Sequence, residues 1–499
     1  MELKFILEKA ANEGIALTFD DVRLQTGYSK VMPDDVNVES RFSRNVKLKI
    51  PIVSAAMDTV SESKLAIELA KLGGIGVIHR NLSIKDQVFH VKRVKHHLNG
   101  LVEKPICVYE DENISSIIIK REEKGYTFNS FPILNREEKL VGIISSNDFE
   151  FCDDSFLTAK DIMSTELLTA QEGLSLDDAY HLMQKEKKKV LPLVNQNMEI
   201  KGMYVFSDVK RIKTRSADHY NVDNKGQLRV AAAVGTGEEA IERADALCEA
   251  NVDVIVIDTA HGDSESVLQT LKKIKEKHEI DVVVGNISIG ESARRLAEAG
   301  ADGIKIGQGP GSICTTRIIA GIGRPQLSAI YDCAKVTEKF DIPICADGGL
   351  RVSGDIPIAI AAGADCVMMG SMLAGTEESP GDIIFSQGRQ WKGYRGMGSL
   401  GAMEKSKSSR ERYLQKDEEK NKLIPEGVEG LVPYKGKLKD VVFQYVGGLR
   451  RGMGYVGAAS IKELKDKGQF DRITSAGFSE SHPHDIEVTI DSPNYSFKR

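Results

Sequence analysis

Short runs of β-branched and other apolar residues alternate with helical patterns along most of the 499-residue chain. This alternation is typical of βαβ units and a parallel sheet. Helices are predicted between most of the runs, for example over Glu238–Glu249, Glu265–Lys277 and Glu291–Ala299. Eight strands are predicted, at Ile50–Met57, Gly74–His79, Arg229–Val234, Val252–Asp258, Asp281–Asn286, Asp302–Gly307, Ile342–Asp347 and Asp365–Gly370. So regular a series favours an α/β fold closed into a (β/α)8 TIM barrel over an open sheet.

One segment of about 140 residues, between the second and third strands, breaks this rhythm and contains an internal repeat. Phe131–Leu134 returns 60 residues later as Leu191–Val194, and a following glycine-led strand with a terminal aspartate returns at the same spacing. We expect two copies of a small α/β unit, at about 91–152 and 153–217. Barrel segments 1–90 and 218–499 flank them. The repeated aspartates favour ligand binding over a purely architectural repeat.

Two further segments of the carboxyl-terminal part differ from the barrel pattern. Glu404–Lys422 is almost wholly polar, so we expect a mobile flap, about 386–430 with its flanks, that buries no core face. The tail Thr474–Arg499 is predicted to be loop-like. Two GxGxxG matches, Gly396–Gly401 and Gly452–Gly457, lie outside any predicted strand–turn–helix unit and are rejected as dinucleotide fingerprints.

Composition narrows the class of protein. The formal net charge of −6 argues against non-specific binding to nucleic acid or to an anionic membrane. No signal peptide or membrane span is predicted, and seven cysteines without CxxC spacing are typical of reduced thiols in a cytoplasmic protein. The spacing of cysteines and histidines predicts no structural metal site.

The carboxyl ends of barrel strands carry the candidate chemistry. Strand seven ends in Asp347-Gly348-Gly349 and strand eight in Gly370-Ser371, where backbone amides and a hydroxyl could hold a phosphate and Asp347 a ribose diol. Strand six leads into a glycine-rich loop that presents Cys314 in a polar setting, as a nucleophile requires. The other cysteines predicted on strands or helices are Cys248, Cys333, Cys345 and Cys366, and we interpret them as inert.

The loop Gly309–Arg317 (GPGSICTTR) resembles that of IMP dehydrogenases and GMP reductases. Matching motifs extend over nearly the whole chain and include Ser54–Asp58, Ala346–Gly349, Tyr394–Ser399 and Arg412-Tyr413. The repeated insert resembles a tandem cystathionine-β-synthase (CBS) pair. The resemblance implies NAD-dependent oxidation of IMP to XMP, the committed step of guanine nucleotide synthesis, by a homotetramer or octamer whose CBS pair binds adenine or guanine nucleotides.

The resemblance also implies residue roles. Cys314 would attack C2 of the purine, and Thr316, Arg412 and Tyr413 would serve the later hydrolysis. IMP contacts would be Met57, Asn286, Ser312, Asp347, Gly348, Gly349, Gly370, Ser371, Tyr394, Gly396, Met397, Gly398 and Glu426. NAD contacts would be Asp258, Thr259, Ala260, Gly307 and Gly309. Carbonyls of Gly309, Gly311 and Cys314 would bind K⁺, with Glu480, Ser481 and His482 of a neighbouring subunit. Asp148 and Asp208 would hold nucleotide ribose in the CBS pair.

Several alternatives stay open. Guanidinium is a poor base, so water activation by Arg412 competes with a relay from Thr316 towards Glu426. A GMP reductase using NADPH shares the barrel, cysteine and phosphate loops, although Arg412-Tyr413 and the CBS insert favour the dehydrogenase. A flavin-dependent barrel oxidoreductase, or a nucleotide-sensing protein centred on the CBS pair, are further alternatives.

Overall fold

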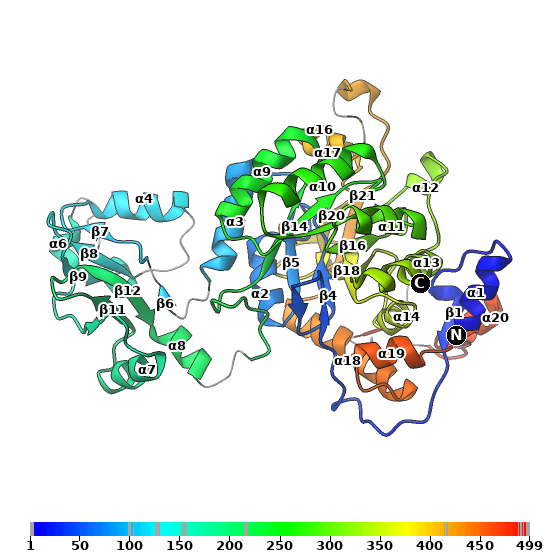
Figure 1. Cartoon of the computed structure of the whole chain (residues 1–499), viewed down its shortest axis with the longest axis horizontal. Helices are drawn as coiled ribbons and strands as arrows, with labels where there is room; N and C mark the ends of the chain where they lie inside the picture. Colours follow the sequence, from blue (N-terminus) through cyan, green and yellow to red (C-terminus); the bar gives the residue numbers. More distant parts are fainter. Residues whose placement is uncertain are drawn as a thin grey trace. The chain divides into compact units, whose positions relative to one another are not determined.

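The computed structural model describes residues 4–97, 101–102, 104–124, 130–150, 152, 157–213, 218–413, 415, 418–487, 489, 492 and 494–495. Contacts divide it into two compact units, Met1–Val91 with Arg229–Arg499, and Lys92–Leu228. In the first unit, eight parallel strands close into a barrel surrounded by helices (Figure 1). The predicted (β/α)8 barrel is therefore confirmed.

The barrel strands are uniformly apolar because both faces of each are covered. In spatial order they are β13 (Val230–Val234), β14 (Val254–Asp258), β15 (Asp281–Ile287), β16 (Gly303–Ile306), β17 (Ile344–Asp347), β18 (Cys366–Met369), β4 (Ile52–Ser54) and β5 (Ile75–Ile78). Each lies within or almost within its predicted range. Interdigitated side chains such as Val77, Val254, Val283 and Met368 fill the interior as one buried core. The barrel is thus packed, and chemistry is confined to its ends.

Helices cover the outside of the barrel. They include α2 (Ser63–Lys71), α3 (Ile84–Lys95), α9 (Gly237–Glu249), α10 (Glu265–Lys277), α11 (Gly290–Glu298), α13 (Gln326–Thr337), α14 (Asp355–Ala361), α18 (Leu438–Val456) and α19 (Ile461–Lys467). The GxGxxG match at Gly452–Gly457 lies mostly inside α18, and Gly457 ends that helix with a φ of 77°. The match at Gly396–Gly401 leads from β20 (Arg389–Arg395) into α16 (Leu400–Lys405). No helix in the described ranges is long and apolar enough to cross a membrane.

The second unit contains the two repeat copies, each with its own apolar core. One sheet has the order β7 (Val108–Tyr109), β8 (Phe131–Leu134), β9 (Leu140–Ile144), and the other β10 (Ala170–Gln171), β11 (Val190–Val194), β12 (Ile200–Val205), β6 (Leu101–Val102). The helices are α4 (Ile114–Lys124), α5 (Ser146–Glu150), α6 (Ala159–Ile162), α7 (Leu176–Lys185) and α8 (Phe206–Lys213).

The compact insert extends to Leu228, beyond the predicted end at 217. Lys95 Nζ lies 2.8 Å from Asp223 Oδ2, so the residues that leave the insert are held by the helix that enters it. Sequence patterns do not reveal such a contact because the two residues are far apart along the chain. Residues 153 and 217, the predicted internal and terminal boundaries, lie outside the described residues.

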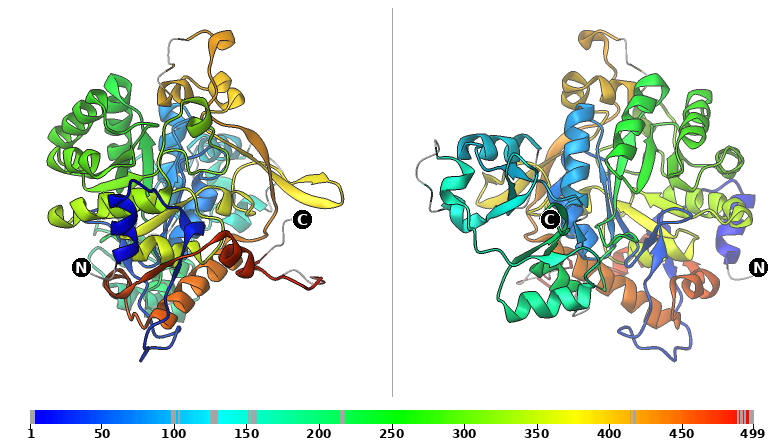
Figure 2. Two further views of the ribbon diagram at one scale, coloured as in Figure 1. Left: turned by 90° about the vertical axis from the view of Figure 1, so that its right-hand side faces the viewer. Right: turned by 60° about the vertical axis from the view of Figure 1, so that its left-hand side comes forward.

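The described residues of the predicted flap contain regular secondary structure. Its first ten residues belong to a sheet of β19 (Ile384–Ser386), β20 and β21 (Glu429–Pro433), whose hairpin protrudes in Figure 2. The polar segment that follows contains α16 and α17 (Lys407–Arg412), and Ser409 is fully buried. Polar partners on the barrel, and not an apolar core face, hold this segment.

The chain ends pack on the barrel unit. Strand β22 (Phe470–Arg472) pairs antiparallel with β1 (Val22–Leu24), beside α1 (Phe5–Asn12). The tail, predicted to be loop-like, begins with helix α20 (Ser475–Glu480), which the Thr474 side chain caps by accepting from Gly477 N. A serine or threonine hydroxyl at this position satisfies an amide that has no partner within the helix.

Candidate functional site

A buried polar cluster occupies the carboxyl ends of neighbouring barrel strands. Lys305 Nζ lies 2.9 Å from Asp258 Oδ1 and 2.7 Å from Asp347 Oδ2, and it also donates to Asn286 Oδ1. Asn286 Nδ2 in turn donates to Asp347 Oδ2 at 2.9 Å and to the Gly307 carbonyl at 2.6 Å. The Lys305 side chain is only 1% exposed. One buried ammonium therefore balances two carboxylates and fixes their positions.

Lys305 was missed by the sequence analysis, although Asp258, Asn286 and Asp347 were not. It lies inside β16, a strand that otherwise contains only apolar residues and glycine. A single charged residue in such a strand was the available signal, since a buried charge needs a partner. Its partners lie on three other strands, so the pattern along β16 could not name them.

The Cys314 loop is held by backbone pairing. Thr315 N donates to the Glu426 carbonyl at 2.9 Å, and Glu426 N donates to the Gly398 carbonyl at 3.0 Å. Cys314 Sγ donates to Thr316 Oγ1 at 3.2 Å, and the Cys314 side chain is partly accessible. The structure thus brings the predicted nucleophile and the Thr316 hydroxyl close to Gly398 and Glu426, two of the predicted IMP contacts.

Tyr394 brings together the residues predicted to hold a phosphate. Its hydroxyl lies 3.9 Å from Met57 Sδ, and a Cβ added at Gly370 would stand 2.7 Å from it. Burial raises the pKa of Tyr394 above its ordinary value, while hydrogen bonds with Ser312 and the backbone of Ser371 oppose that change. Tyr394 therefore stays a neutral hydrogen-bonding group at neutral pH.

Gly348 and Gly349 need to be glycines for conformational reasons. Their φ angles are +87° and +83°, in the left-handed region that residues with a Cβ rarely adopt. A Cβ at Gly348 would lie 3.1 Å from Pro310 Cγ and 3.3 Å from Gly311 N. The turn after β17 therefore packs directly against the Cys314 loop.

The flap reaches the same end of the barrel. Arg412 forms an ion pair with Asp258, and its carbonyl accepts from Ala260 N at 3.3 Å. A Cβ at Gly398 would lie 2.5 Å from the Tyr413 ring, so the ring rests on that glycine. Arg412 thus contacts Asp258 and Ala260, two of the residues predicted to contact a dinucleotide.

Burial affects both flap side chains. It lowers the pKa of the Arg412 guanidinium, and the nearby Arg80 charge acts in the same direction while Tyr413 opposes it. Burial also raises the pKa of the Tyr413 phenol, against the influence of Arg412. The docked flap therefore partly buries the two side chains predicted to serve hydrolysis, and the Arg412 side chain is 14% exposed.

The remaining predicted dinucleotide contacts have structural partners. Thr259 N and Thr259 Oγ1 both donate to the Gly285 carbonyl at 2.9 Å. Gly307 and Gly309 have positive φ angles of 149° and 80°, and a Cβ at Gly309 would lie 2.5 Å from Arg317 Cγ. Arg317 thereby sets the path of the loop before Cys314.

The predicted cation ligands fall in two places. Gly309, Gly311 and Cys314 share one loop, and Cys314 N donates to the Gly311 carbonyl at 3.0 Å. Glu480 ends α20, Ser481 follows it, and the His482 ring lies 4.9 Å from the Phe478 ring. The two groups belong to different elements of the chain.

In the insert, the two repeated aspartates each stand in the first turn of a helix. Asp148 accepts from Ser145 N at 2.6 Å and from Ser145 Oγ at 2.8 Å. Asp208 accepts from Arg211 Nη1 at 3.2 Å. Equivalent positions in the two copies agree with their 60-residue spacing.

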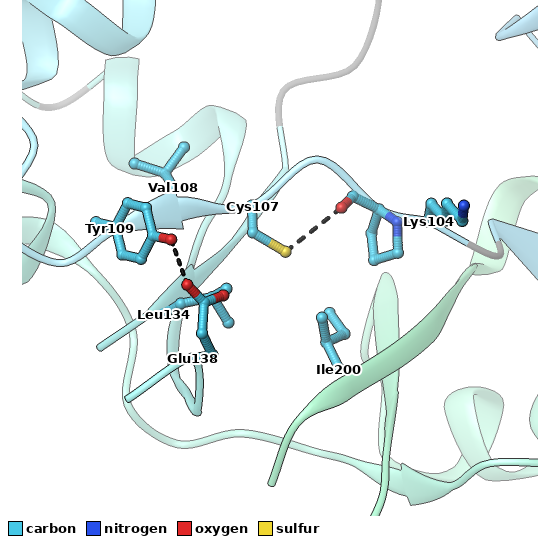
Figure 3. A pocket seen from close by; sticks show the side chains of 8 residues that line it. Lys104, Cys107, Val108, Tyr109, Leu134, Glu138 and Ile200 are labelled. Atoms are coloured by element: carbon cyan, nitrogen blue, oxygen red, sulfur yellow. Dashed lines mark hydrogen bonds between the residues drawn. The ribbon is translucent and has the colours of Figure 1, made fainter. Parts of the chain in front are cut away.

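The insert also contains a pocket of about 340 Å³ that includes neither aspartate (Figure 3). It is lined by Lys104, Pro105, Cys107, Val108, Tyr109, Leu134, Glu138 and Ile200. Tyr109 donates to Glu138, and Cys107 Sγ donates to the Pro105 carbonyl at 3.4 Å. Burial raises the pKa of Cys107 to about 11, so this thiol is neutral at neutral pH.

Comparisons with known proteins agree with this geometry. Residues 16–484 match the model of the IMP dehydrogenase / GMP reductase domain. Inosine-5′-monophosphate dehydrogenase of Aquifex aeolicus is 51% identical over 98% of this chain and 99% of its own length, and that of Bacillus subtilis is 47% identical over the same shares. A crystal structure of GMP reductase from Trypanosoma brucei with guanosine 5′-monophosphate covers 96% of this chain and 100% of its own, with 40% identity and a TM-score of 0.87. The chain belongs to the IMP dehydrogenase / GMP reductase family.

Proposed function

We propose that this protein oxidises IMP to XMP with NAD⁺ in two half-reactions at one site, and so supplies guanine nucleotide synthesis. The observation that carries the proposal is the ion pair between Arg412 and Asp258, together with the hydrogen bond from Ala260 N to the Arg412 carbonyl. Because the flap covers predicted dinucleotide contacts, it would dock only after the cofactor leaves. The same surface would then bind the cofactor in the first half-reaction and the flap in the second. The relatives named as inosine-5′-monophosphate dehydrogenases support the choice of reaction.

In the first half-reaction, the Cys314 thiol gives up its proton and its sulfur adds to C2 of the purine, while the hydrogen at C2 leaves as hydride. NAD⁺ supplies the hydride acceptor. Asp347, held by Lys305 and Asn286, would accept from the ribose hydroxyls, since its carboxylate remains 18% exposed. Tyr394, Ser312, Ser371 and the glycines near them would hold the phosphate through hydroxyl and amide donors.

In the second half-reaction, water adds to C2 of the thioimidate and the carbon–sulfur bond breaks, which releases XMP and the Cys314 thiol. Arg412 and Tyr413 stand over the site when the flap is docked. Burial favours a neutral Arg412, whereas the Asp258 carboxylate in contact with it favours the cation. A relay through Thr316, which already accepts from Cys314 Sγ, therefore remains the competing route for the proton.

GMP reduction is the second candidate function. The insert does not separate the two activities, because the Trypanosoma brucei GMP reductase covers 96% of this chain. The Arg412-Tyr413 pair and the relatives named as inosine-5′-monophosphate dehydrogenases argue for the dehydrogenase. Mixing the protein with IMP and NAD⁺ should produce NADH absorbance, whereas GMP with NADPH should give no loss of NADPH. The reverse pattern would establish the reductase instead.

The division of labour can be tested by rapid mixing. Cys314→Ala should bind IMP but release no NADH, because the phosphate and ribose contacts lie on other residues. Arg412→Ala should give a burst of NADH close to one per site, then a much slower steady rate, with a purine adduct on Cys314 visible by mass spectrometry. Arg412→Lys should rescue only in part, since an ammonium lacks the planar fork of guanidinium. A slower burst in Arg412→Ala would mean that the flap acts in binding or hydride transfer.

Two binding roles complete the proposal. The carbonyls of Gly309, Gly311 and Cys314 would hold K⁺, and Glu480, Ser481 and His482 of a neighbouring subunit would complete its shell in a tetramer. The CBS pair would bind adenine or guanine nucleotides, with Asp148 and Asp208 at the ribose. Support comes from the shared loop of the three carbonyls and from the equivalent helix-start positions of the two aspartates.

A further inference from the structure

A second contact of the flap lies beside the one made by Arg412. Glu411, the residue before it, places its two carboxylate oxygens against two different barrel loops. Oε2 lies 3.3 Å from Nη1 of Arg80, which follows β5, and Oε1 accepts from the backbone N of Thr236, which follows β13, at 3.1 Å. Arg80 Nη1 also donates to Ser408 Oγ at 3.1 Å. The Arg80 side chain is 3% exposed and that of Glu411 is 14% exposed.

The next residue of the same barrel loop holds the flap by a neutral contact. Ser409 Oγ donates to Asn81 Oδ1 at 3.0 Å, and Ser409 is fully buried. Asn81 Nδ2 donates to Asp58 Oδ2 at 3.1 Å, and Asp58 is paired with Arg395 of β20. Helix α17 is therefore attached through both of the barrel residues Arg80 and Asn81.

Gly235 leaves the space in which the ion pair forms. A Cβ at this position would overlap Arg80 Nη1 and would stand 2.7 Å from Glu411 Oε1. Its backbone is not in the left-handed region, so alanine would meet no conformational penalty there. The two charged side-chain ends would instead have to move apart.

Arg80 has little else to compensate its charge. Its Nη2 atom is buried and makes no hydrogen bond within the described part of the chain. Burial lowers the pKa of Arg80, Glu411 and Glu239 oppose this, and the nearby Arg243 adds to it. Because a buried cation is costly without a carboxylate, the docked flap provides Arg80 with the partner it needs.

From these contacts we propose that Arg80 and the Gly235-Thr236 turn form a receptor for the Glu411 carboxylate, and that this clamp docks α17 so that Arg412 reaches Asp258. Arg80 and Glu411 are positioning residues, since neither is placed against the substrate. The link from docking to hydrolysis rests on the proposed function, whereas the docking itself does not.

The clamp can be tested by hydrogen exchange of the full-length protein. Arg80→Ala, Glu411→Gln and Gly235→Ala should each expose the amides of residues 400–413, with exchange at least about tenfold faster, because a hydrogen bond to a charged group contributes about that factor or more. Exchange in the β14 and β15 peptides should stay unchanged and so report an intact barrel. Gly235→Ala alters neither charged partner, so it separates docking from a general loss of charge.

Glu419→Gln provides the matched control. It removes the same charge from the same polar segment, but Glu419 is exposed and pairs across 3.1 Å with Lys422, which is exposed as well. Its flap exchange should match that of the unaltered protein. The double variant Arg80→Ala/Glu411→Gln should speed exchange by less than the product of the two single effects, since both single variants lose the contact between Arg80 and Glu411. Fully additive effects on exchange would overturn the proposal. It would also be overturned if flap exchange in Glu411→Gln and Gly235→Ala were equal to that in Glu419→Gln.

Kinetics distinguish the clamp from the proposed function. In the clamp variants the NADH burst should keep its rate while the steady rate falls, and Arg80→Lys should recover part of the loss. An unaltered protein that forms no NADH from IMP and NAD⁺ would refute the proposed function, yet the exchange experiment would still decide the clamp. A normal burst with unchanged steady rates in all three clamp variants would separate the clamp from hydrolysis and refute its positioning role.

Discussion

Replacing Lys305 with methionine should leave two carboxylates without their common cation. Asp258 and Asp347 lie 2.9 and 2.7 Å from the Lys305 ammonium, which is almost wholly buried. Methionine has a similar length, so the change removes charge and little volume. Removing one partner of a buried ion pair costs about 3–5 kcal/mol, and Arg412 can compensate Asp258 only while the flap is docked. We therefore expect the free energy of unfolding of the barrel to fall by about 3 kcal/mol or more.

The assay compares urea midpoints of Lys305→Met and a surface control, Lys335→Met. Lys335 lies on α13, half exposed, and pairs with Glu8 at 2.8 Å. An exposed pair of this kind contributes about 1 kcal/mol or less.

Binding provides a second measurement. If Asp347 holds the ribose, Lys305→Met should weaken IMP binding at least about tenfold in calorimetry, because loss of a charged hydrogen-bonding partner frees the carboxylate to move. Lys335→Met should bind IMP normally. Equal stability of the two variants, together with unchanged IMP affinity, would refute the view that Lys305 organises this site.

Three further outcomes are expected. At pH 8, iodoacetamide should modify Cys314 before Cys107 and Cys248, and IMP should protect Cys314, because burial raises the pKa of Cys107 and of Cys248 to about 11 and only about one in a thousand of these two thiols is ionised. Labelling of Cys107 and Cys248 should rise about tenfold per pH unit up to pH 11, and equal rates for all three thiols at pH 8 would contradict this. Joining Val91 to Arg229 through a short Gly-rich linker should leave IMP oxidation intact and abolish any response to ATP or GTP, whereas an unfolded barrel would show that the insert is integral. Replacing Na⁺ by K⁺ at constant ionic strength should raise activity, and Glu480→Ala should blunt that rise; equal rates in both salts would count against a cation site.

The barrel could be predicted from sequence because its signal is local. Each strand is a run of residues buried on both faces, and such runs contain no polar alternation that could be confused with a half-exposed sheet. The loop before Cys314 was also recognisable, since glycine, serine and threonine surround the cysteine in adjacent positions. The repeat in the insert was visible for the same reason, as two similar stretches 60 residues apart.

Only the tertiary structure showed how charges are matched. Lys305 belongs to β16, but its carboxylate partners end β14 and β17, and Arg80 lies 331 residues before Glu411. Composition alone indicated that the segment containing Glu411 and Arg412 buries no core face. Its charged side chains are nevertheless largely covered, because Asp258, Arg80 and Asn81 are placed opposite it by the closure of the barrel. Local patterns therefore determined which elements form and which loop carries the reactive thiol, whereas the cost of burying each charge depends on a partner that only the folded chain brings near.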